Sequence, residues 1–315
     1  MNRTMIQAVN TATDSAPRRA LTTRARHRPS HLGWLFLIPA LSVYGIFVLW
    51  PILQTIRYSF YSWDGVDKPQ WAGLRNFRAV FTDPQLTSTL VHVAELILFF
   101  TVIPVGLGLV LAAIMQRVTS RRVTSVARAV LILPQIVPLV AAGIAWSWVL
   151  SSSGVVNQVL QAIGLRHITR AWLGDFTTAL PSVGLIGAWV LLGLCTVLLS
   201  VGMGKIDASL YEAAVLDGAG RIREFFAVTL PSLRNEIAVC VTVTMISALS
   251  AFDIVYITTQ GGPGNATMVP GLKVYQLAFF NRQVGLASAL ALVLMVIVIL
   301  CIMPVQSLSR RSGDE

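Results

Sequence analysis

The sequence predicts an all-α polytopic membrane protein with six transmembrane helices. Hydrophobic residues make up 55% of the 315 residues and charged residues only 12%, so the chain cannot cover itself with an ordinary solvated surface. Six apolar runs are each long enough to cross about 30 Å of hydrocarbon as a helix. Basic residues gather near the ends of these runs, which is typical of membrane proteins.

The first expected span lies near 32–56, and its apolar run is too long for a secretory signal peptide and is closed by no small-residue cleavage site. The second lies near 88–116 and is rich in small residues between Gly106 and Met115, which lets helix backbones approach closely. Prolines inside spans predict kinks that neighbouring helices tolerate. The remaining four spans are expected near 129–150, 180–203, 237–259 and 284–306.

The distribution of basic residues predicts that both termini are cytoplasmic. With that orientation, 16 of the 24 Lys and Arg residues fall in cytoplasmic segments, as expected because short loops rich in Lys and Arg stay inside. The polar, basic segment 1–31 is expected to be disordered beside anionic membrane lipid. The sequence thus predicts a transmembrane domain at 32–308, with a cytoplasmic loop at about 204–236, and a cytoplasmic tail at 309–315.

Composition and motifs argue against several other classes of protein. The net charge of +10 is explained by membrane topology, so we expect no nucleic-acid partner. Three cysteines lie inside spans and the four histidines are scattered, so we expect no metal site. The sequence has no phosphate-binding GxxxxGK[ST] loop and no candidate catalytic group. We therefore expect no cofactor on this chain, and energy for uphill transport must come from another chain.

The cytoplasmic loop contains the charged stretch "YEAAVLDGAGRIREFFAVTLP", which ends at Pro231. Good helix formers predict one short helix over 210–216 and a second over 221–230. Gly218, after Asp217, predicts a bend between them, since glycine accepts positive φ. Such a pair of helices would expose a knob of small and apolar side chains, which favours a protein partner. The knob is formed by Ala213, Ala214, Ala219 and Phe225.

The same stretch resembles the EAA loop of bacterial ABC-importer permeases, EAA-x3-G-x9-I-x-L-P. Its matching residues are Glu212-Ala213-Ala214, Gly218 and Val228-Thr229-Leu230-Pro231, with Val228 replacing Ile. Asn235 stands where sugar permeases often have a second proline. The resemblance implies a type I ABC-importer permease fold and a loop that docks into a cleft on a cytoplasmic ATPase. The residues expected to transmit force are Glu212, Ala213, Ala214, Asp217, Gly218, Ala219, Phe225, Leu230 and Pro231.

Two further stretches, "WAGLRNFRAVFTDP" at 71–84 and "SAFDIVYITTQGGPG" at 250–264, resemble the subfamily that carries oligosaccharides and glycerol-phosphate. This resemblance implies a second permease around a shared path, two ATPase subunits that bind ATP and Mg, and an extracellular or periplasmic binding protein. It also implies a multi-pass protein of the bacterial plasma (inner) membrane. The corresponding substrate-path positions are Gly187, Trp189, Leu191, Leu194, Ser250, Phe252, Asp253 and Tyr256.

Polar residues at membrane depth are costly and are functional candidates. Asp253 and Tyr256 are one helical turn apart and are expected near one face, where they could hydrogen-bond a sugar while Trp189 offers an apolar face. Pairing of Asp253 with the second permease is nearly as plausible. Glu95 has His92 three residues earlier, and these two are expected to pair structurally at least as readily as they would contact substrate.

Two alternative classes of function remain. One is an ion-coupled secondary transporter or channel that uses Glu95 or Asp253, although neither an inverted repeat nor a pair of broken helices is evident. The other is a polytopic enzyme, for which no cluster of catalytic groups is evident. A narrower alternative is a glycerol-phosphate-type substrate, which would require Arg or Lys in a path that has almost none.

Overall fold

The computed structural model describes residues 32–310. The expected disordered segment 1–31 and most of the expected tail at 309–315 lie outside these residues. The chain divides into two compact units, which end and begin at Pro51 and Ile52. The first unit holds the helix α1 (Leu32–Tyr44), the π-helical turn η1 (Gly45–Leu49) and the start of α2 (Trp50–Ser59).

Within residues 32–310, four helices are long and apolar enough to cross a membrane, or six segments if each of two bent helix pairs is one span. The predicted spans near 32–56, 180–203 and 284–306 correspond to α1–η1–α2, α9 (Ala179–Met203) and α16 (Val284–Arg310). The predicted span near 88–116 corresponds to α4 (Pro84–Ile97), the π-helical η2 (Leu98–Val102) and α5 (Ile103–Arg117). The all-α class is confirmed, apart from one two-stranded hairpin.

Two predicted spans are broken, so the expectation of no broken helices is wrong. The span predicted near 129–150 consists of α6 (Arg121–Ile136) and α7 (Leu139–Val149), which meet at 97°. The break lies at Val137, which precedes Pro138 and has the extended φ of −70° and ψ of 127°, as expected because a proline disfavours helical geometry in the residue before it.

The span predicted near 237–259 also differs, because its helix α13 (Arg234–Leu249) ends ten residues early and α14 (Asp253–Thr258) follows. At the break, the amide of Phe252 donates to the carbonyl oxygen of Ser250 across 2.7 Å. At its other end α13 meets the helical segment 221–232 at 70°. Hydrophobicity alone cannot locate such breaks, because the chain stays apolar through them.

Three of the π-helical turns each end two residues before a proline. They are η1 before Pro51, η2 before Pro104 and η4 (Phe225–Thr229) before Pro231. A proline has no amide hydrogen and clashes with the carbonyl of the preceding turn. A π-helical turn widens the helix at that point, so these helices continue through prolines that would otherwise break them.

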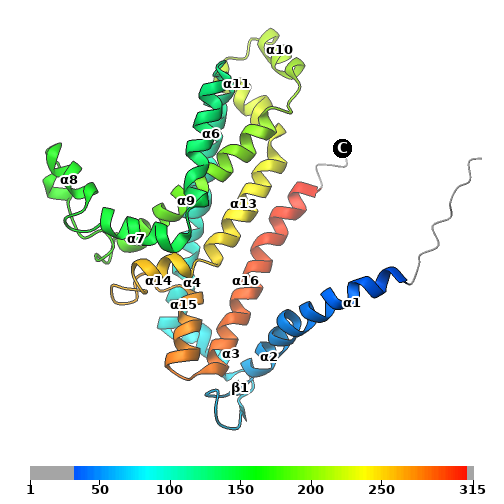
Figure 1. Cartoon of the computed structure of the whole chain (residues 1–315), viewed down its shortest axis with the longest axis vertical. Helices are drawn as coiled ribbons and strands as arrows, with labels where there is room; N and C mark the ends of the chain where they lie inside the picture. The colour runs from blue at the N-terminus through cyan, green and yellow to red at the C-terminus, as the bar shows by residue number, and fades with distance from the viewer. Residues whose placement is uncertain (1–31, 311–315) are drawn as a thin grey trace, which may run out of the picture. The chain divides into compact units, whose positions relative to one another are not determined.

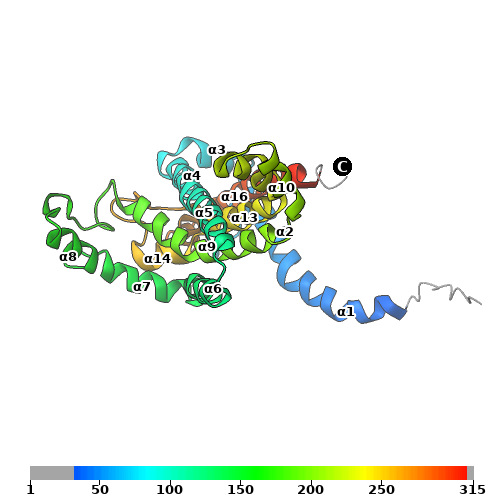
Figure 2. The ribbon, with the colours of Figure 1, turned by 90° about the horizontal axis from the view of Figure 1, so that it is seen from above.

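Helix α9 lies at the centre of the second unit and contacts α5, α6 and α13, as the view from above shows (Figure 2). Small residues permit this packing. A Cβ at Gly193 of α9 would overlap the carbonyl oxygen of Leu131 on α6, and one at Gly108 of α5 would lie 3.2 Å from the Cβ of Cys195. The predicted close approach of helices at the small-residue stretch of the second span is therefore confirmed.

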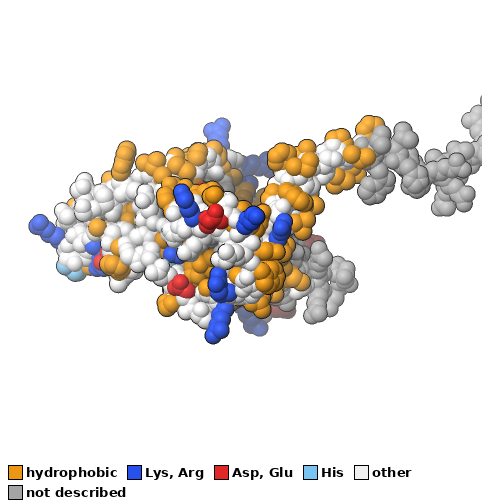
Figure 3. All heavy atoms as spheres, turned by 90° about the horizontal axis from the view of Figure 1, so that it is seen from below, with side chains coloured by type: hydrophobic (Ala, Val, Ile, Leu, Met, Phe, Trp, Pro, Cys, Tyr) orange, Lys and Arg blue, Asp and Glu red, His pale blue; other side chains and the backbone are white. Residues whose placement is uncertain are grey.

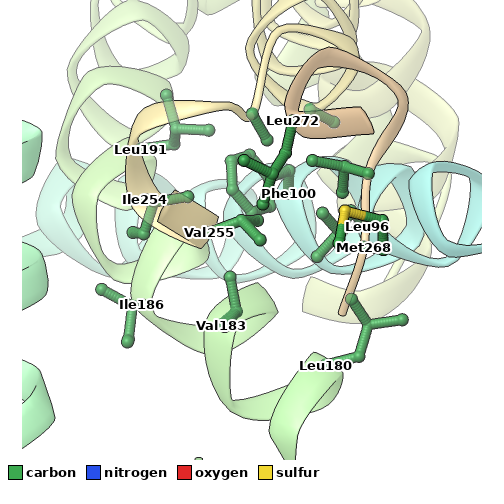
Figure 4. Packing of buried hydrophobic residues seen from close by; sticks show 13 residues of the cluster. Leu96, Phe100, Leu180, Val183, Ile186, Leu191, Ile254, Val255, Met268 and Leu272 are labelled. Atoms are coloured by element: carbon green, nitrogen blue, oxygen red, sulfur yellow. The ribbon is translucent and has the colours of Figure 1, made fainter. Parts of the chain in front are cut away.

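A core of buried apolar side chains joins α4, η2, α9, α14 and the segment leading to α15 (Pro270–Tyr275). Leu96, Phe100, Val183, Val255 and Met268 converge there from these elements (Figure 4). Because α14 is held by this core, the break between α13 and α14 is a packed feature of the fold.

The remaining elements lie in loops. Strands β1 (Tyr61–Ser62) and β2 (Gln70–Trp71) pair antiparallel before α3 (Arg75–Thr82). Buried Asn76 fixes this hairpin by donating to the carbonyl oxygens of Ser59 and Tyr61 at 2.9 and 2.8 Å. The segment between α7 and α9 contains α8 (Val155–Ala162) and the 3-10 turn η3 (Arg166–Ile168), and the π-helical η5 (Gln276–Phe280) follows α15.

Candidate functional site

The segment between α9 and α13 folds as two short helices joined by a glycine bend. Helix α10 (Ala208–Leu216) is capped by Asp207, whose carboxylate accepts from the amide of Ser209 at 2.9 Å. This backbone hydrogen bond, with a second from the Ser209 side chain, lowers the pKa of Asp207 from its ordinary value of 3.8. Gly218 follows with a φ of +74°, which confirms the predicted bend.

The second helix of this segment is continuous across three short elements. They are α11 (Arg221–Glu224), the π-helical η4 and α12 (Leu230–Ser232). The hydroxyl groups of Tyr211 and Thr229 lie 3.2 Å apart and connect this helix to α10. Figure 1 places the segment at the far end of α13 from α14.

The exposed face of the segment differs in part from the predicted knob. Glu212, Ala213, Asp217, Gly218 and Pro231 are exposed, and Ala214, Ala219 and Leu230 are half-buried. The largest exposed apolar side chains come from other positions: Leu216 is 87% exposed, Ile222 77% and Phe226 61%.

Phe225, which the sequence places in the exposed knob, is half-buried. Its ring packs against the buried cluster that contains Leu199, Met203 and Leu233 of α9 and the start of α13. The π-helical geometry of η4 turns Phe225 inward and leaves Phe226 outward. Phe225 therefore connects the segment mechanically to α9 and α13.

A second candidate site lies where the two broken spans meet. It is a cavity of about 340 Å³ between the end of α6, the middle of α9 and the break between α13 and α14. Irregular backbone at membrane depth is tolerated where it lines a cavity, and this cavity uses both breaks. Its polar lining comes from Gln135, Ser247, Ser250 and Asp253. Its apolar lining comes from Phe100, Val137, Leu139, Gly187, Val190, Leu191, Ile246, Ala251 and Ile254.

The cavity brings together half of the predicted substrate-path residues: Gly187, Leu191, Ser250 and Asp253 line it. Asp253 lies in the first turn of α14 and is exposed, a position in which the helix dipole favours its negative charge. Among the residues that line the cavity, Asp253 carries the one charged side chain. The cavity can therefore offer a carboxylate, two hydroxyls and an amide to a polyhydroxylated ligand.

The other four predicted path residues lie outside this lining. Trp189 packs edge-on against Trp146, with ring centroids 5.5 Å apart, and Leu194 is half-buried on α9. Phe252 and Tyr256 are stacked with centroids 5.4 Å apart. Tyr256 therefore shares an aromatic cluster with Phe252 rather than the cavity with Asp253.

Sequence reasoning missed three participants in these sites. Gln135 is a polar residue between Pro134 and Pro138 in an otherwise apolar run, and that combination could have identified it. Ser247 lies three residues before Ser250 on α13. Tyr275 lies far along the chain, yet its ring is 5.5 Å from that of Phe252 and 5.9 Å from that of Tyr256, which no spacing rule predicts.

The expected pair of His92 and Glu95 does not form. The Nδ1 atom of His92 lies 2.9 Å from the carbonyl oxygen of Met268, which connects α4 to the segment before α15. Glu95 is exposed and, among residues 32–310, has no hydrogen bond or ion pair. The pairing prediction is wrong because three-residue spacing places the two side chains near each other without aligning them, and a backbone acceptor is available to His92.

No group of three or more His, Cys, Asp and Glu side chains in the described part of the chain is placed to hold a metal ion.

Comparisons with known proteins agree with this architecture. Residues 105–311 match the family described as "binding-protein-dependent transport system inner membrane component". A probable ABC transporter permease protein of Bacillus subtilis, YurN, is 36% identical over 84% of this chain and 91% of its own length. NgcF of Streptomyces coelicolor, a diacetylchitobiose uptake system permease protein, is 31% identical over 88% of this chain and 82% of its own length.

A solved structure shares the fold. It is a bacterial ABC transporter involved in the import of the acidic polysaccharide alginate, and one of its chains superposes with a TM-score of 0.74 at 23% identity. The match covers 89% of this chain and 95% of that one. The predicted type I ABC-importer permease fold is confirmed.

Proposed function

Because the chain belongs to the family of binding-protein-dependent transport system inner membrane components, we propose that it is a permease subunit of an ATP-driven importer for a sugar or a related polyol. The relative NgcF is described as a permease for diacetylchitobiose uptake, which supports the sugar class. The chain itself is non-catalytic in this account, and partner ATPase chains bind ATP and Mg.

The observation that carries the proposal is the geometry of the segment between α9 and α13. It presents Glu212, Ala213 and Asp217 on an exposed helix that a glycine bend holds at an angle to the next. Through Phe225 the segment is packed against α9 and α13, and these helices lead to the cavity. The arrangement can convert displacement of the segment into rearrangement of the cavity walls.

The mechanism that follows is mechanical coupling. ATP-driven closure of two ATPase subunits displaces the docked segment, and α9 and α13 move with it because the core around Phe225 is packed and transmits strain. The path then alternates between two access states. A second permease completes the path, and a binding protein on the outer side delivers substrate.

Within this account, the residues that transmit force are Glu212, Ala213, Ala214, Asp217, Gly218, Ala219, Phe225, Leu230 and Pro231. The cavity residues Ser250 and Asp253, joined by Gln135 and Ser247, supply hydrogen bonds to hydroxyl groups. The cavity lining contains no Lys or Arg, which favours a neutral sugar over a glycerol-phosphate. The permease domain spans 32–308 in the bacterial inner membrane, with both termini in the cytoplasm.

Deletion of the gene tests the proposal in cells. Uptake of one class of radiolabelled di- or oligosaccharide should be lost and then restored by the full chain. Uptake should also persist when an ionophore dissipates ion gradients and should stop when ATP is depleted. Unchanged uptake of every sugar tested, or uptake that follows the ion gradient, would contradict the proposal and favour the ion-coupled alternative.

A further inference from the structure

A groove next to the coupling segment has the chemistry of a phospholipid site. It has a volume of about 320 Å³ and is lined by Val110, Ala113, Ile114 and Arg117 of α5 together with Arg221, Ile222, Phe225 and Phe226. Six of these eight side chains are apolar, and the other two are arginines. The groove therefore combines hydrocarbon walls with two guanidinium groups.

The walls of the groove are exposed to a degree that water would disfavour. Val110 and Ile114 are 53% and 56% exposed, and Ile222 and Phe226 are 77% and 61% exposed. Large apolar side chains gathered on a surface indicate a contact with another apolar body. Hydrophobic side chains are exposed over broad areas elsewhere on the protein as well (Figure 3), as expected of a chain that faces acyl chains.

The two arginines are free to bind an anion. Neither Arg117 nor Arg221 has a hydrogen bond or an ion pair among residues 32–310. Arg117 is the last residue of α5 and ends the apolar helical run that starts at Pro84. It therefore lies at a membrane boundary, where lipid phosphates are found.

The orientation of the second wall favours a lipid over a protein partner. The helical segment 221–232 meets the membrane-spanning α13 at 70°, so it runs closer to the membrane plane than to the membrane normal. Exposed Ile222 and Phe226 with Arg221 and Arg223 on one short helix are typical of a helix that lies in the interface. Such a helix buries its apolar side chains among acyl chains and places its arginines at headgroup level.

We propose that this groove binds an anionic phospholipid of the cytoplasmic leaflet. An acyl chain lies against Ile114, Ile222 and Phe226, and the phosphate is held between Arg117 and Arg221. The assignment of the leaflet rests on the proposed function, which places the coupling segment in the cytoplasm. The bound lipid would join α5 to the coupling segment and so set how stiffly that segment is held when an ATPase displaces it.

Binding is tested on the purified full chain in detergent micelles by native mass spectrometry. Dioleoyl-phosphatidylglycerol and dioleoyl-phosphatidylcholine have the same acyl chains, so their difference reports headgroup recognition. The double variant Arg117→Gln/Arg221→Gln should bind phosphatidylglycerol about 30-fold more weakly, because each basic residue near an anionic lipid surface contributes about five-fold in affinity. The matched control Arg121→Gln/Arg223→Gln removes the same charge outside the groove and should retain binding.

Three results would overturn the proposal. They are equal retention of the two lipids by the wild-type chain, equal loss of binding in both double variants, and displacement of phosphatidylglycerol by an equal concentration of glycerol 3-phosphate, which would indicate a free-phosphate site. Because none of these measurements depends on transport, they can fail while the transport proposal stands.

A second measurement holds even if the arginine variants do not fold. Phosphatidylglycerol with a photoreactive acyl chain should label the wild-type chain at Ile114 or at Phe226, both in the isolated chain and in the assembled transporter. Labelling confined to other helices would overturn the assignment. Loss of labelling on assembly, with a crosslink from this groove to a protein subunit in its place, would show that a protein covers the groove and would also overturn it.

Discussion

The amide of Ala219 donates to the carbonyl oxygen of Ala214 across 2.9 Å, which closes the end of helix α10 around Gly218. A second bond, from the amide of Gly218 to the carbonyl oxygen of Val215 at 3.0 Å, completes the turn. This closure requires the left-handed backbone of Gly218, whose φ is +74°. The angle between the two short helices of the coupling segment therefore depends on one residue.

Replacing Gly218 by valine should uncouple transport. A Cβ at this position would meet no atom within 4 Å, so the cost is purely conformational, about 1–3 kcal/mol for a β-branched residue held at positive φ. Sugar uptake and substrate-stimulated ATP hydrolysis should fall together in the assembled transporter, while the amount of chain in the membrane stays normal. Gly218→Asn should retain much of the activity, since asparagine tolerates this backbone conformation.

Gly220 provides the matched control for that experiment. A Cβ added at Gly220 would also meet no atom within 4 Å, but the φ of this residue is −71°, which valine adopts without strain. Gly220→Val should therefore transport normally. Equal loss of coupling in the two valine variants would show that bulk on this surface matters rather than the backbone bend.

The Asp253 carboxylate should contribute to substrate binding through hydrogen bonds. Asp253→Asn keeps the size of the side chain and most of its hydrogen-bonding capacity, whereas Asp253→Leu removes both. We expect uptake to be lowered modestly by Asn and severely by Leu, with assembly on the ATPases intact in both variants. Initial uptake rates and co-purification of the subunits check this.

Glu95 is the matched control for Asp253, because it is an exposed carboxylate in a membrane-spanning helix and does not line the cavity. Glu95→Gln and Glu95→Leu should have similar, small effects on initial uptake. If both Asp253 variants lose the assembled complex equally, the carboxylate is structural, and it then pairs with the second permease.

The contact between α6 and α9 should be sensitive to a single methyl group. Gly193→Ala would place its Cβ against the carbonyl oxygen of Leu131, whereas Gly106→Ala would place its Cβ in open space. Overpacking of this kind costs about 1–3 kcal/mol, so Gly193→Ala should lower the thermal denaturation midpoint in detergent and Gly106→Ala should leave it unchanged. A midpoint equal to that of the wild type for Gly193→Ala would mean that the two helices are not in close contact.

The cap of helix α10 should weaken in acid. Since its hydrogen bonds with Ser209 lower the pKa of Asp207 below 3.8, the cap stabilises the folded state fully above that pH and is lost as the pH falls through the lower, folded pKa. Hydrogen exchange at residues 209–211, normalised to intrinsic rates, should speed up over this acid range. Asp207→Asn should abolish the pH dependence, and protection that increases in acid would contradict the assignment.

The helical architecture was largely predictable because apolar length and basic flanks report directly on membrane crossing. The bend at Gly218 was predictable for a similar reason, since only local backbone chemistry decides it. The breaks after Ile136 and Leu249 were missed because hydrophobicity does not change there. A break of this kind depends on local backbone geometry, as at Val137 before Pro138, and on packing by distant elements, as in the core beneath α14.

The candidate site was predictable only in part. Asp253 and Ser250 are polar residues in an apolar span, which identified them before the fold was known. Tyr256 and Trp189 were assigned to the path by position, yet each packs on a neighbouring aromatic ring, Phe252 and Trp146 respectively. Phe225 was expected outside because helical spacing alone does not anticipate the π-helical turn that directs it into the core.

Reconstitution into proteoliposomes tests the central claim, that this chain transports only when it is coupled to ATPase subunits. Liposomes that contain the chain with a second permease, two ATPases and the binding protein should accumulate labelled sugar when ATP is supplied to the ATPase side. The chain alone should accumulate none, with or without an imposed ion gradient. Gradient-driven uptake by the chain alone, without any ATPase, would contradict the account.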